Sequence, residues 1–345
     1  MDNRVSIVLV NFKGEKDTIE CIESILKSDY INYQIIVVDN SEGEASLQFI
    51  QNWLAGQSQH TIDTFFPELI FPLQNKPCSV RLFREDEFRL LSQTFSENIL
   101  LVKSSKNSGF AGGNNIAIEY CLRTQSFDFI WLLNNDTVIK KDTLHVLVRF
   151  ATNSPQRTGI IGSKLFLYKE KEKLQAVGGR YFPWFGIVKE VGYGEKDIGQ
   201  WDKDLFQFDY VVGASMFMQS EFLNEVGLME EDYFLYYEEI DWAIRGREKG
   251  WSESFCPEAI IYHKQGASTG SKRNFNSAIS DFYSVRNRIL LARKYFPYTL
   301  PTLYLSFGLF IFNRLRLGQF SRIKLFFKVI INPNGHFKKG SPELF

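Results

Sequence analysis

Four groups of acidic or imidazole side chains in this sequence follow apolar runs or open a polar segment. They are Asp39, Asp136, the pair Glu238-Glu239 with Asp241, and His263. Asp39 ends the run Ile-Ile-Val-Val, Asp136 follows an apolar run and two asparagines, and His263 follows Ile-Ile-Tyr. Carboxylates and imidazoles at such positions can bind a divalent cation, contact a nucleoside or act as a general base.

Each group taken alone also has a structural explanation. Asp39 stands in a turn-like DNSEGE, and Asn-Asn-Asp at 134–136 is typical of an Asx turn or a helix cap. A lone histidine such as His263 is more often a satisfied structural residue than a ligand. Asp241 lies four residues before Arg245, which is the spacing of a salt bridge on a solvated helix face. The residues alone therefore leave both roles open.

The apolar runs that precede these groups predict the elements that position them. They lack polar alternation, as expected for strands covered on both faces, and they lie at residues 5–12, 34–39, 99–102 and 129–133. Helical patterns separate them, so the sequence predicts an α/β domain with a mostly parallel central sheet flanked by helices. We place this domain at residues 1–294, with a pattern-free insertion at about 46–98. We expect residues 295–345 to form a basic and apolar C-terminal helical tail.

A glycine-rich stretch, NSGFAGGNN at residues 107–115, follows one of these strands. We expect a flexible loop here, followed by a helix from about Asn114 to Leu122. Free N–H groups at the start of a helix can receive a phosphate. The stretch is not GxGxxG and lacks the lysine of a P-loop, so it is a weak signal by itself.

Composition and charge exclude some functions. The 345 residues carry no net formal charge, so no global field favours nucleic acid as a partner. The four cysteines are scattered without a CxxC pair, which favours buried structural thiols in a reduced compartment. The N-terminus enters a strand without a signal-peptide pattern, and we therefore expect a cytoplasmic location.

The tail has the composition of a membrane-surface segment. From Tyr295 onward it contains seven Lys/Arg and one Asp/Glu. Its uncharged stretch between Lys294 and Arg314 approaches the roughly 20 residues of a membrane span, but Pro297 and Pro301 interrupt it. The following alternation of basic and apolar residues is typical of an interfacial helix. We expect peripheral contact with the inner face of the plasma membrane; a tail docked on the body, a true span and an oligomer interface are the alternatives.

Seven blocks along the chain together resemble a known family. In order they are VSIVLVNFKG, IIVVDNS, KNSGFAGGNN, WLLNNDTV, VVGASMFM, YYEEIDWAIR and IIYHKQGAST. They resemble the inverting family 2 glycosyltransferases with a GT-A fold, particularly the rhamnosyltransferase-like branch, from about Val5 to Phe296. The resemblance implies sugar transfer, with rhamnose from dTDP-rhamnose as first candidate, to a surface polysaccharide or lipid-linked glycan. The alternatives are a UDP-hexose or UDP-galactofuranose transferase of the same fold and a non-catalytic nucleotide-sugar or glycan-binding module.

The resemblance also implies roles on the donor side. The residues expected to contact the nucleotide-sugar are Asp39, Asn107, Gly109, Gly112, Asn115 and Asn135. Asn134-Asn135-Asp136 stands where the family has its DxD-like motif, so Asp136 is the expected main ligand of Mg²⁺ or Mn²⁺. His263 matches a histidine that serves as a second metal ligand in relatives. Hard, oxygen-preferring ions accept imidazole less readily than carboxylate.

On the acceptor side, the resemblance implies a general base within the pair Glu238-Glu239. The family has Glu-Asp here, so the second carboxylate of this chain lies one methylene further out. We assign Glu239 as the base, with Glu238 and Asp241 positioning the acceptor. Gly213 and Ala214 are small residues at the expected end of a strand, where they would let acceptor or donor sugar approach the backbone.

Overall fold

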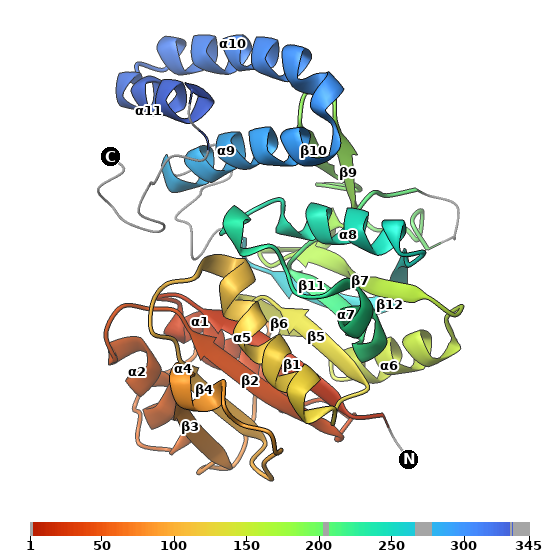
Figure 1. Cartoon of the computed structure of the whole chain (residues 1–345). Coiled ribbons are helices and arrows are strands. Elements are labelled where there is room, and N and C mark those ends of the chain that lie inside the picture. Colours follow the sequence, from red (N-terminus) through yellow and green to blue (C-terminus); the bar gives the residue numbers. More distant parts are fainter. Residues whose placement is uncertain (1–2, 203–206, 266–277, 332, 334–345) are drawn as a thin grey trace.

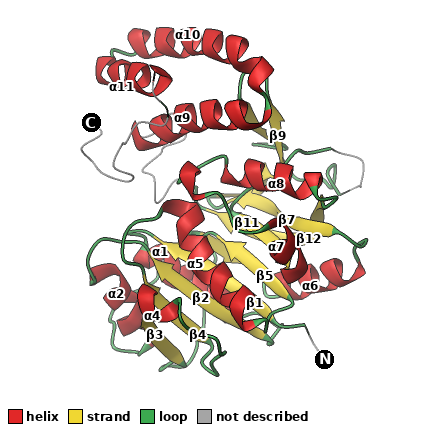
Figure 2. Cartoon of the chain, viewed as in Figure 1, coloured by secondary structure: helices red, strands yellow, loops and turns green. Residues whose placement is uncertain are grey.

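The computed structural model describes residues 3–202, 207–265, 278–331 and 333 of the chain (Figure 1, Figure 2). In this part of the chain, a 10-stranded sheet forms the centre of the molecule. Its strands are β1 (Val5–Asn11), β2 (Tyr33–Asp39), β3 (Val80–Arg84), β4 (Ile99–Lys103), β5 (Phe129–Leu133), β6 (Thr137–Ile139), β7 (Thr158–Leu167), β8 (Glu170–Ala176), β11 (Ser215–Gln219) and β12 (Ser252–His263). They lie in the order β3-β4-β2-β1-β5-β11-β7-β12-β6, with β8 paired to β7.

The strand directions bring the polar side chains to one edge. Strands β3, β4, β2, β1 and β5 pair in parallel, and β12 is parallel to β7. The intervening β11 is antiparallel to both β5 and β7, so those two also run the same way. The carboxyl ends of these strands, β11 excepted, therefore meet at a common edge, and the predicted mostly parallel α/β sheet is confirmed.

The reversal of β11 corrects one expectation. Gly213 and Ala214 precede β11, whereas the sequence analysis placed them at the end of a strand. Because β11 runs opposite to β5, its beginning lies where β5 ends, and the amide of Asn134 donates to the carbonyl of Ala214 at 3.0 Å. The two small residues thus still border the carboxyl edge of the sheet.

Helices cover both faces of the sheet, which explains the strands without polar alternation. Along β1, the side chains of Val5, Ile7 and Leu9 pack on one face and that of Val8 on the other, all fully buried. The first face packs against α1 (Glu15–Ile25), α2 (Ala45–Leu54), α3 (Pro67–Ile70) and α6 (Thr143–Asn153). The second packs against α4 (Glu85–Phe88), α5 (Gly109–Thr124), α7 (Ser220–Val226) and α8 (Glu238–Glu248).

The segment at about 46–98 is part of this architecture. It supplies most of α2 together with α3 and α4, and its strand β3 extends the sheet as a parallel neighbour of β4. Within β3 only Phe83 is buried, while the neighbouring side chains are exposed or half-buried. An edge strand of this kind has no apolar run, which is why the sequence showed no recognisable pattern there.

Above the sheet lies a small layer that we call the helical cap, formed by α9 (Ala278–Tyr295), α10 (Leu300–Arg316) and α11 (Phe320–Ile331) (Figure 1). A hairpin of β9 (Gly179–Phe182) and β10 (Ile187–Glu190) reaches up beside it, where Thr302 donates to the carbonyl of Trp184 at 2.7 Å. Phe282, Phe307 and Phe326 are buried inside the cap. None of the helices in the described ranges is both long and apolar enough to cross a lipid bilayer.

Candidate active site

Asp136 and His263 form the centre of the candidate site. The chain leaves β5, passes through Asp136 and pairs as β6 with the end of β12, so that Thr137 stands opposite His263. As a result Oδ1 of Asp136 lies 2.9 Å from Nε2 of His263, and both side chains are buried. Burial opposes charge on both groups, but their mutual attraction and hydrogen bond prevail, lowering the pKa of Asp136 and raising that of His263.

These two residues supply donors suited to a divalent cation. A carboxylate oxygen and a ring nitrogen face one another, and oxygen ligands with one imidazole are compatible with Mn²⁺. Among the described residues there is no cluster of three or more His, Cys, Asp or Glu side chains that could hold a metal. Asp136 and His263 are the two side chains here that would hold such a cation.

A second chain of hydrogen bonds holds the other side of the imidazole. Nδ1 of His263 lies 2.8 Å from Oε1 of Gln175 on β8. The amide nitrogen of Gln175 in turn donates to Oε1 of Glu190 at the end of β10, at 3.0 Å. Burial raises the pKa of Glu190, although Gln175 and His263 act in the opposite direction. Gln175 and Glu190 were not among the residues predicted from the sequence.

Glu238 and Glu239 stand at the first turn of α8. Glu238 is buried, and within the described part of the chain its Oε2 atom has no hydrogen-bond partner. Burial and the neighbouring Glu239 raise the pKa of Glu238 well above its usual range. Glu239 is half-buried, and burial raises its pKa to about 7. Hydrogen bonds from backbone N–H groups act to lower the pKa, and the charge of Glu190 acts to raise it further. The pair thus combines a neutral carboxylic acid with a carboxylate that titrates near neutral pH.

An unusual turn leads into α8. Phe234, Tyr236 and Tyr237 have φ values of 64°, 70° and 75°, a backbone region that non-glycine residues rarely adopt. The side-chain amide nitrogen of Asn287, on α9, lies 2.8 to 2.9 Å from three carbonyl oxygens of this turn, including that of Tyr236. Asn287 is completely buried. A residue of the helical cap therefore stabilises the strained turn that presents the two glutamates.

Asp241 has a separate set of partners. Its carboxylate is completely buried and lies 2.7 Å from nitrogen atoms of Arg245 and Lys294 and 2.7 Å from the hydroxyl of Tyr295. Burial opposes its ionisation, but Lys294, Arg245 and Tyr295 together hold the pKa of Asp241 below its usual range. The ion pair between Asp241 and Arg245 that their four-residue spacing predicted is present. The structure thus places Asp241 in an ion-pair network between α8 and α9.

Asp39 and Asn135 are buried within the ends of the neighbouring strands. Nδ2 of Asn11 donates to Asp39 at 2.6 Å, and Nζ of Lys103 lies 2.8 Å from the same carboxylate. Asn135 donates to the hydroxyl of Thr18 at 2.8 Å, in the first turn of α1. These bonds link the carboxyl ends of β1, β2 and β4 and the segment after β5 into one polar layer.

The glycine-rich stretch is helical sooner than expected. Helix α5 begins at Gly109, so Gly112 lies inside it, and the predicted loop up to residue 115 is wrong. Asn107 accepts a hydrogen bond from the amide of Gly109 at 3.0 Å, which starts the helix. Gly109 has φ +72°, and a Cβ atom there would lie 2.2 Å from the carbonyl oxygen of Phe234. The glycine is needed for this close backbone approach rather than for loop flexibility.

Asn115, further along α5, has a bridging position. Its side chain accepts from the amide of Met229 and donates to the carbonyl of the same residue, each at 3.0 Å. It also donates to Glu231 at 3.0 Å. The structure therefore joins Asn115 to the segment that precedes the strained turn.

Gly213 is half-buried, and a Cβ there would have only the ring of Phe110 nearby, at 3.7 Å, which leaves space beside it.

A family model described as "Glycosyltransferase like family 2" matches residues 84–280, more than half of the 345 residues. The chain belongs to glycosyltransferase family 2. The match contains Asp136, His263 and the glutamates of α8, whereas β1, α1, Asp39 and nearly all of the cap lie outside it. This match does not distinguish the rhamnosyltransferase branch from other branches of the family.

Two characterised relatives agree with the family. The chain is 22% identical over 298 residues to the low-salt glycan biosynthesis hexosyltransferase Agl10 of Haloferax volcanii, covering 85% of this chain and 76% of the relative. It is 24% identical over 202 residues to the dTDP-rhamnosyl transferase RfbF of Shigella flexneri, covering 57% of this chain and 64% of the relative.

The fold is also that of a GT-A glycosyltransferase. The crystal structure of GalNAc-T7 with UDP, GalNAc and Mn²⁺ superimposes with a TM-score of 0.54 at 13% identity over 84% of this chain. The chain spans about half of that protein, 48% of its length. At this identity the likeness concerns the fold alone, and it agrees with the predicted GT-A architecture.

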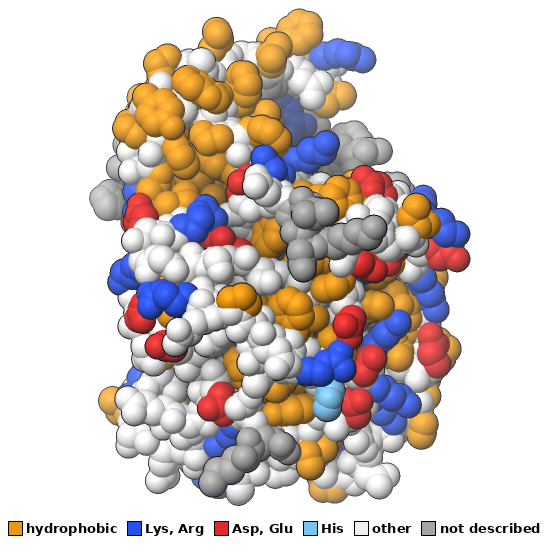
Figure 3. Space-filling model, turned by 90° about the vertical axis from the view of Figure 1, so that its right-hand side faces the viewer, with side chains coloured by type: hydrophobic (Ala, Val, Ile, Leu, Met, Phe, Trp, Pro, Cys, Tyr) orange, Lys and Arg blue, Asp and Glu red, His pale blue; other side chains and the backbone are white. Residues whose placement is uncertain are grey.

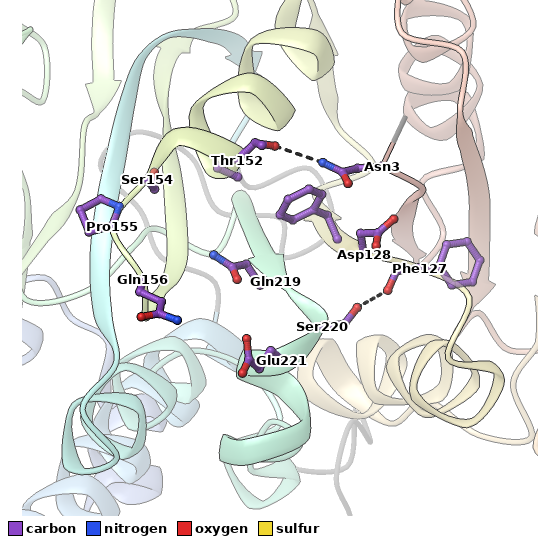
Figure 4. Close-up of a pocket in the computed structure, with 12 residues that line it drawn as sticks. Asn3, Phe127, Asp128, Thr152, Ser154, Pro155, Gln156, Gln219, Ser220 and Glu221 are labelled. Carbon is purple, nitrogen blue, oxygen red and sulfur yellow. Dashed lines mark hydrogen bonds between the residues drawn. The ribbon is translucent and has the colours of Figure 1, made fainter. Parts of the chain in front are cut away.

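A cavity of about 520 Å³ lies away from these residues (Figure 4). It is found at the amino-terminal end of β5 and the carboxyl-terminal end of β11, where Asn3 donates to Thr152 at 3.1 Å and Ser220 donates to the carbonyl of Phe127. None of the candidate ligands or bases of this family 2 protein lines it. The candidate residues and this cavity therefore lie at opposite ends of β5.

Three residues of the site were not predicted from the sequence: Gln175, Glu190 and Asn287. The first two lie in a glycine- and aromatic-rich part of the chain without a ligand pattern, and the third is inside an ordinary helical stretch. Their roles depend on contacts 15 to 88 residues away in the sequence. No local spacing could have shown them.

Proposed function

We propose that this protein is an inverting, metal-dependent hexosyltransferase that moves rhamnose from dTDP-rhamnose to a surface polysaccharide or lipid-linked glycan. The observation that carries the proposal is that one family 2 fold holds the buried Asp136–His263 pair and the glutamates at the start of α8, with Glu190 raising the pKa of both His263 and Glu239. Relatives named as a hexosyltransferase and as a dTDP-rhamnosyl transferase support the class of donor. A UDP-hexose or UDP-galactofuranose donor is the second candidate.

In this proposal Asp136 and His263 hold Mg²⁺ or Mn²⁺ at the diphosphate of the donor. When bound, the cation supplies Lewis-acid stabilisation of the negative charge on the departing nucleotide diphosphate. Asp136 contributes a carboxylate that is ionised across the physiological range, because its neighbour lowers its pKa. GalNAc-T7, which shares the fold, was crystallised with UDP and Mn²⁺.

Glu239 acts as the general base. An oxygen of the acceptor hydroxyl bonds to the anomeric carbon as the bond from that carbon to the diphosphate oxygen breaks, and the hydroxyl proton passes to Glu239. A base with a pKa near 7 is well matched to this transfer at neutral pH. Glu238, kept neutral by burial, can donate a hydrogen bond to the acceptor. A non-catalytic binding module has no need of such a base.

The remaining predicted residues shape the donor site around this centre. Asp39 is already bound by Asn11 and Lys103, so in the proposal it fixes the strand ends beneath the nucleoside. The start of α5 at Asn107 and Gly109 supplies backbone contacts to the nucleoside. Asp241, engaged by its cations, holds α8 in place instead of touching the acceptor.

Calorimetric titration with dTDP, UDP and GDP, each with Mn²⁺ and with EDTA, tests the donor assignment. Metal-dependent binding that favours dTDP is the expected result. A preference for UDP would favour the second candidate, and absence of binding to all three would contradict the proposed function.

Replacement of Asp136 tests the metal assignment. Asp136→Ala should remove the difference in nucleotide affinity between Mn²⁺ and EDTA, because the main carboxylate ligand is lost. Asp128→Ala, which lies at the opposite end of β5, is the matched control and should keep that difference. An unchanged metal effect in Asp136→Ala would refute the assignment.

We also propose that the helical cap rests on the anionic inner leaflet of the plasma membrane, where a lipid-linked acceptor would be found. Hydrophobic side chains gather over the cap (Figure 3). Leu305, Leu309 and Phe312 follow one face of α10 and are 79%, 76% and 65% exposed. Trp184 of the neighbouring hairpin is 54% exposed. Residues 300–331 contain five Lys/Arg and no Asp/Glu, which is the charge pattern that anionic lipids attract.

Sedimentation with vesicles tests the membrane contact. Binding to phosphatidylserine-containing vesicles, weakened in the triple variant Leu305→Ser, Leu309→Ser, Phe312→Ser and by high salt, is expected. Protein that stays in the supernatant with such vesicles would contradict the proposal. A dimer that forms without lipid and is lost in the triple variant would assign the surface to self-association instead.

A further inference from the structure

The hydrogen bonds on the far side of His263 have a consequence for its lone pair. A neutral imidazole carries one proton, either on Nδ1 or on Nε2, and only the unprotonated nitrogen can bind a cation. Nε2 is the nitrogen that faces Asp136, at 2.9 Å. A cation shared by the two residues therefore requires the proton on Nδ1.

Asp136 alone would favour the wrong arrangement. Its carboxylate only accepts hydrogen bonds, so in the absence of other partners it would draw the proton onto Nε2 and block the lone pair. Two other groups act against it. Oε1 of Gln175 lies 2.8 Å from Nδ1 and can only accept a hydrogen bond from it, and the amide nitrogen of Asn134, which is a donor, lies 3.2 Å from Nε2.

Glu190 fixes which end of Gln175 faces the histidine. A glutamine amide can turn over and present either oxygen or nitrogen. Here the amide nitrogen of Gln175 donates to Oε1 of Glu190 at 3.0 Å, so its oxygen points to His263. Gln175 is 3% exposed, and water cannot readily replace these bonds.

We propose that Gln175, oriented by Glu190, is a positioning residue that holds the proton of His263 on Nδ1 and so keeps Nε2 free for a metal ion. The inference rests on the proposed function insofar as it gives His263 a cation to bind. It adds a contribution from the β9–β10 hairpin, since Glu190 ends β10 and thereby connects the hairpin to the metal site. Partners of this kind commonly change metal affinity by about 10- to 100-fold.

The first test reads the proton position directly and needs no metal. In an Asp136→Ala background, which removes the competing acceptor, ¹⁵N NMR of the neutral His263 ring should show the proton on Nδ1. Adding Gln175→Leu should shift the ring toward the Nε2 form. Gln219→Leu, a glutamine on β11 at the distant cavity, should have no effect. An Nε2 form in the Asp136→Ala protein, or no shift in the double variant, would overturn the inference.

The second test measures Mn²⁺ affinity by calorimetry in the presence of dTDP. Gln175→Leu should weaken binding by about 10- to 100-fold. The exchange variant Gln175→Glu with Glu190→Gln keeps the charge and composition of the site. It places a carboxylate oxygen of residue 175 against Nδ1 of His263, and the amide of residue 190 can donate to that carboxylate. This variant should restore Mn²⁺ affinity. If the exchange variant does not recover Mn²⁺ affinity, and if Gln175→Leu leaves the proton position on His263 unchanged in the first test, Gln175 has a packing role only. If wild-type protein binds no Mn²⁺, the proposed function fails, whereas the proton position still decides the role of Gln175.

Discussion

Replacing Glu239 with glutamine should make the protein more stable and much less active. Burial raises the pKa of Glu239 to about 7, from 4.5 for an unburied side chain. For a fully buried group this difference corresponds to roughly 3 kcal/mol of unfavourable ionisation. Because Glu239 is half-buried and solvent screens part of the effect, we expect about 1 to 2 kcal/mol.

The sign of this effect depends on pH. A carboxyl group whose pKa is raised in the folded state stabilises the fold below its unfolded pKa and loses that contribution as the pH rises through about 7. Glu239→Gln should thus match the wild type near about pH 4.5 and exceed it by about 1 to 2 kcal/mol above about pH 8. Urea denaturation at both pH values measures the difference, with Glu221→Gln on the exposed surface of α7 as control.

Activity should change in the opposite direction. Wild-type kcat/KM should rise about tenfold per pH unit below pH 7 and then level off, because only the ionised carboxylate can accept the proton. Glu239→Gln should lose about 10²- to 10⁴-fold at neutral pH. A variant that is destabilised equally at all pH values, and whose activity falls only as far as its folded fraction, would contradict the role of Glu239 as the base.

Three further substitutions test the framework around the site. Asp241→Asn should destabilise the protein by about 2 kcal/mol in urea, because the partly exposed Arg245 and Lys294 lose their charged hydrogen-bond acceptor. Gly109→Ala should cost at least about 2 kcal/mol, since its Cβ would lie 2.2 Å from the carbonyl oxygen of Phe234; a changed thermal midpoint checks this. Asn287→Ala should lower kcat about tenfold or more while sparing nucleotide affinity, because the strained turn before Glu239 loses its hydrogen bonds.

The outcomes that contradict these expectations differ. Asp241→Asn within about 0.5 kcal/mol of wild type would show that the ion pairs contribute little, as solvent-exposed pairs do. A Gly109→Ala protein of normal stability would mean that the contact with Phe234 relaxes freely. Equal losses of kcat and nucleotide affinity in Asn287→Ala would indicate general unfolding instead of a misplaced turn.

The sequence predicted the sheet and its functional edge because both rest on local signals. Unbroken apolar runs identified the strands, and polar residues at their ends identified the edge where Asp136 and His263 meet. The start of α5 was missed, since glycines favour a loop unless a distant backbone, here that of Phe234, makes them necessary inside a helix. The edge strand β3 was missed because only Phe83 is buried. The direction of β11 and the bond between Gln175 and His263 depend on pairing across the fold, which no local pattern reveals.

The position of Asn287 means that the sheet-bearing part and the helical cap are not interchangeable modules. A chain shortened to end at residue 277 would keep each proposed metal ligand and base but lose the amide beside the turn from Tyr233 to Tyr236. Removing α9 together with α10 and α11 to improve solubility would therefore be expected to disorder the turn that presents Glu238 and Glu239. Chimeras with other family members should exchange this turn and α9 together, so that each turn keeps the asparagine that fits it.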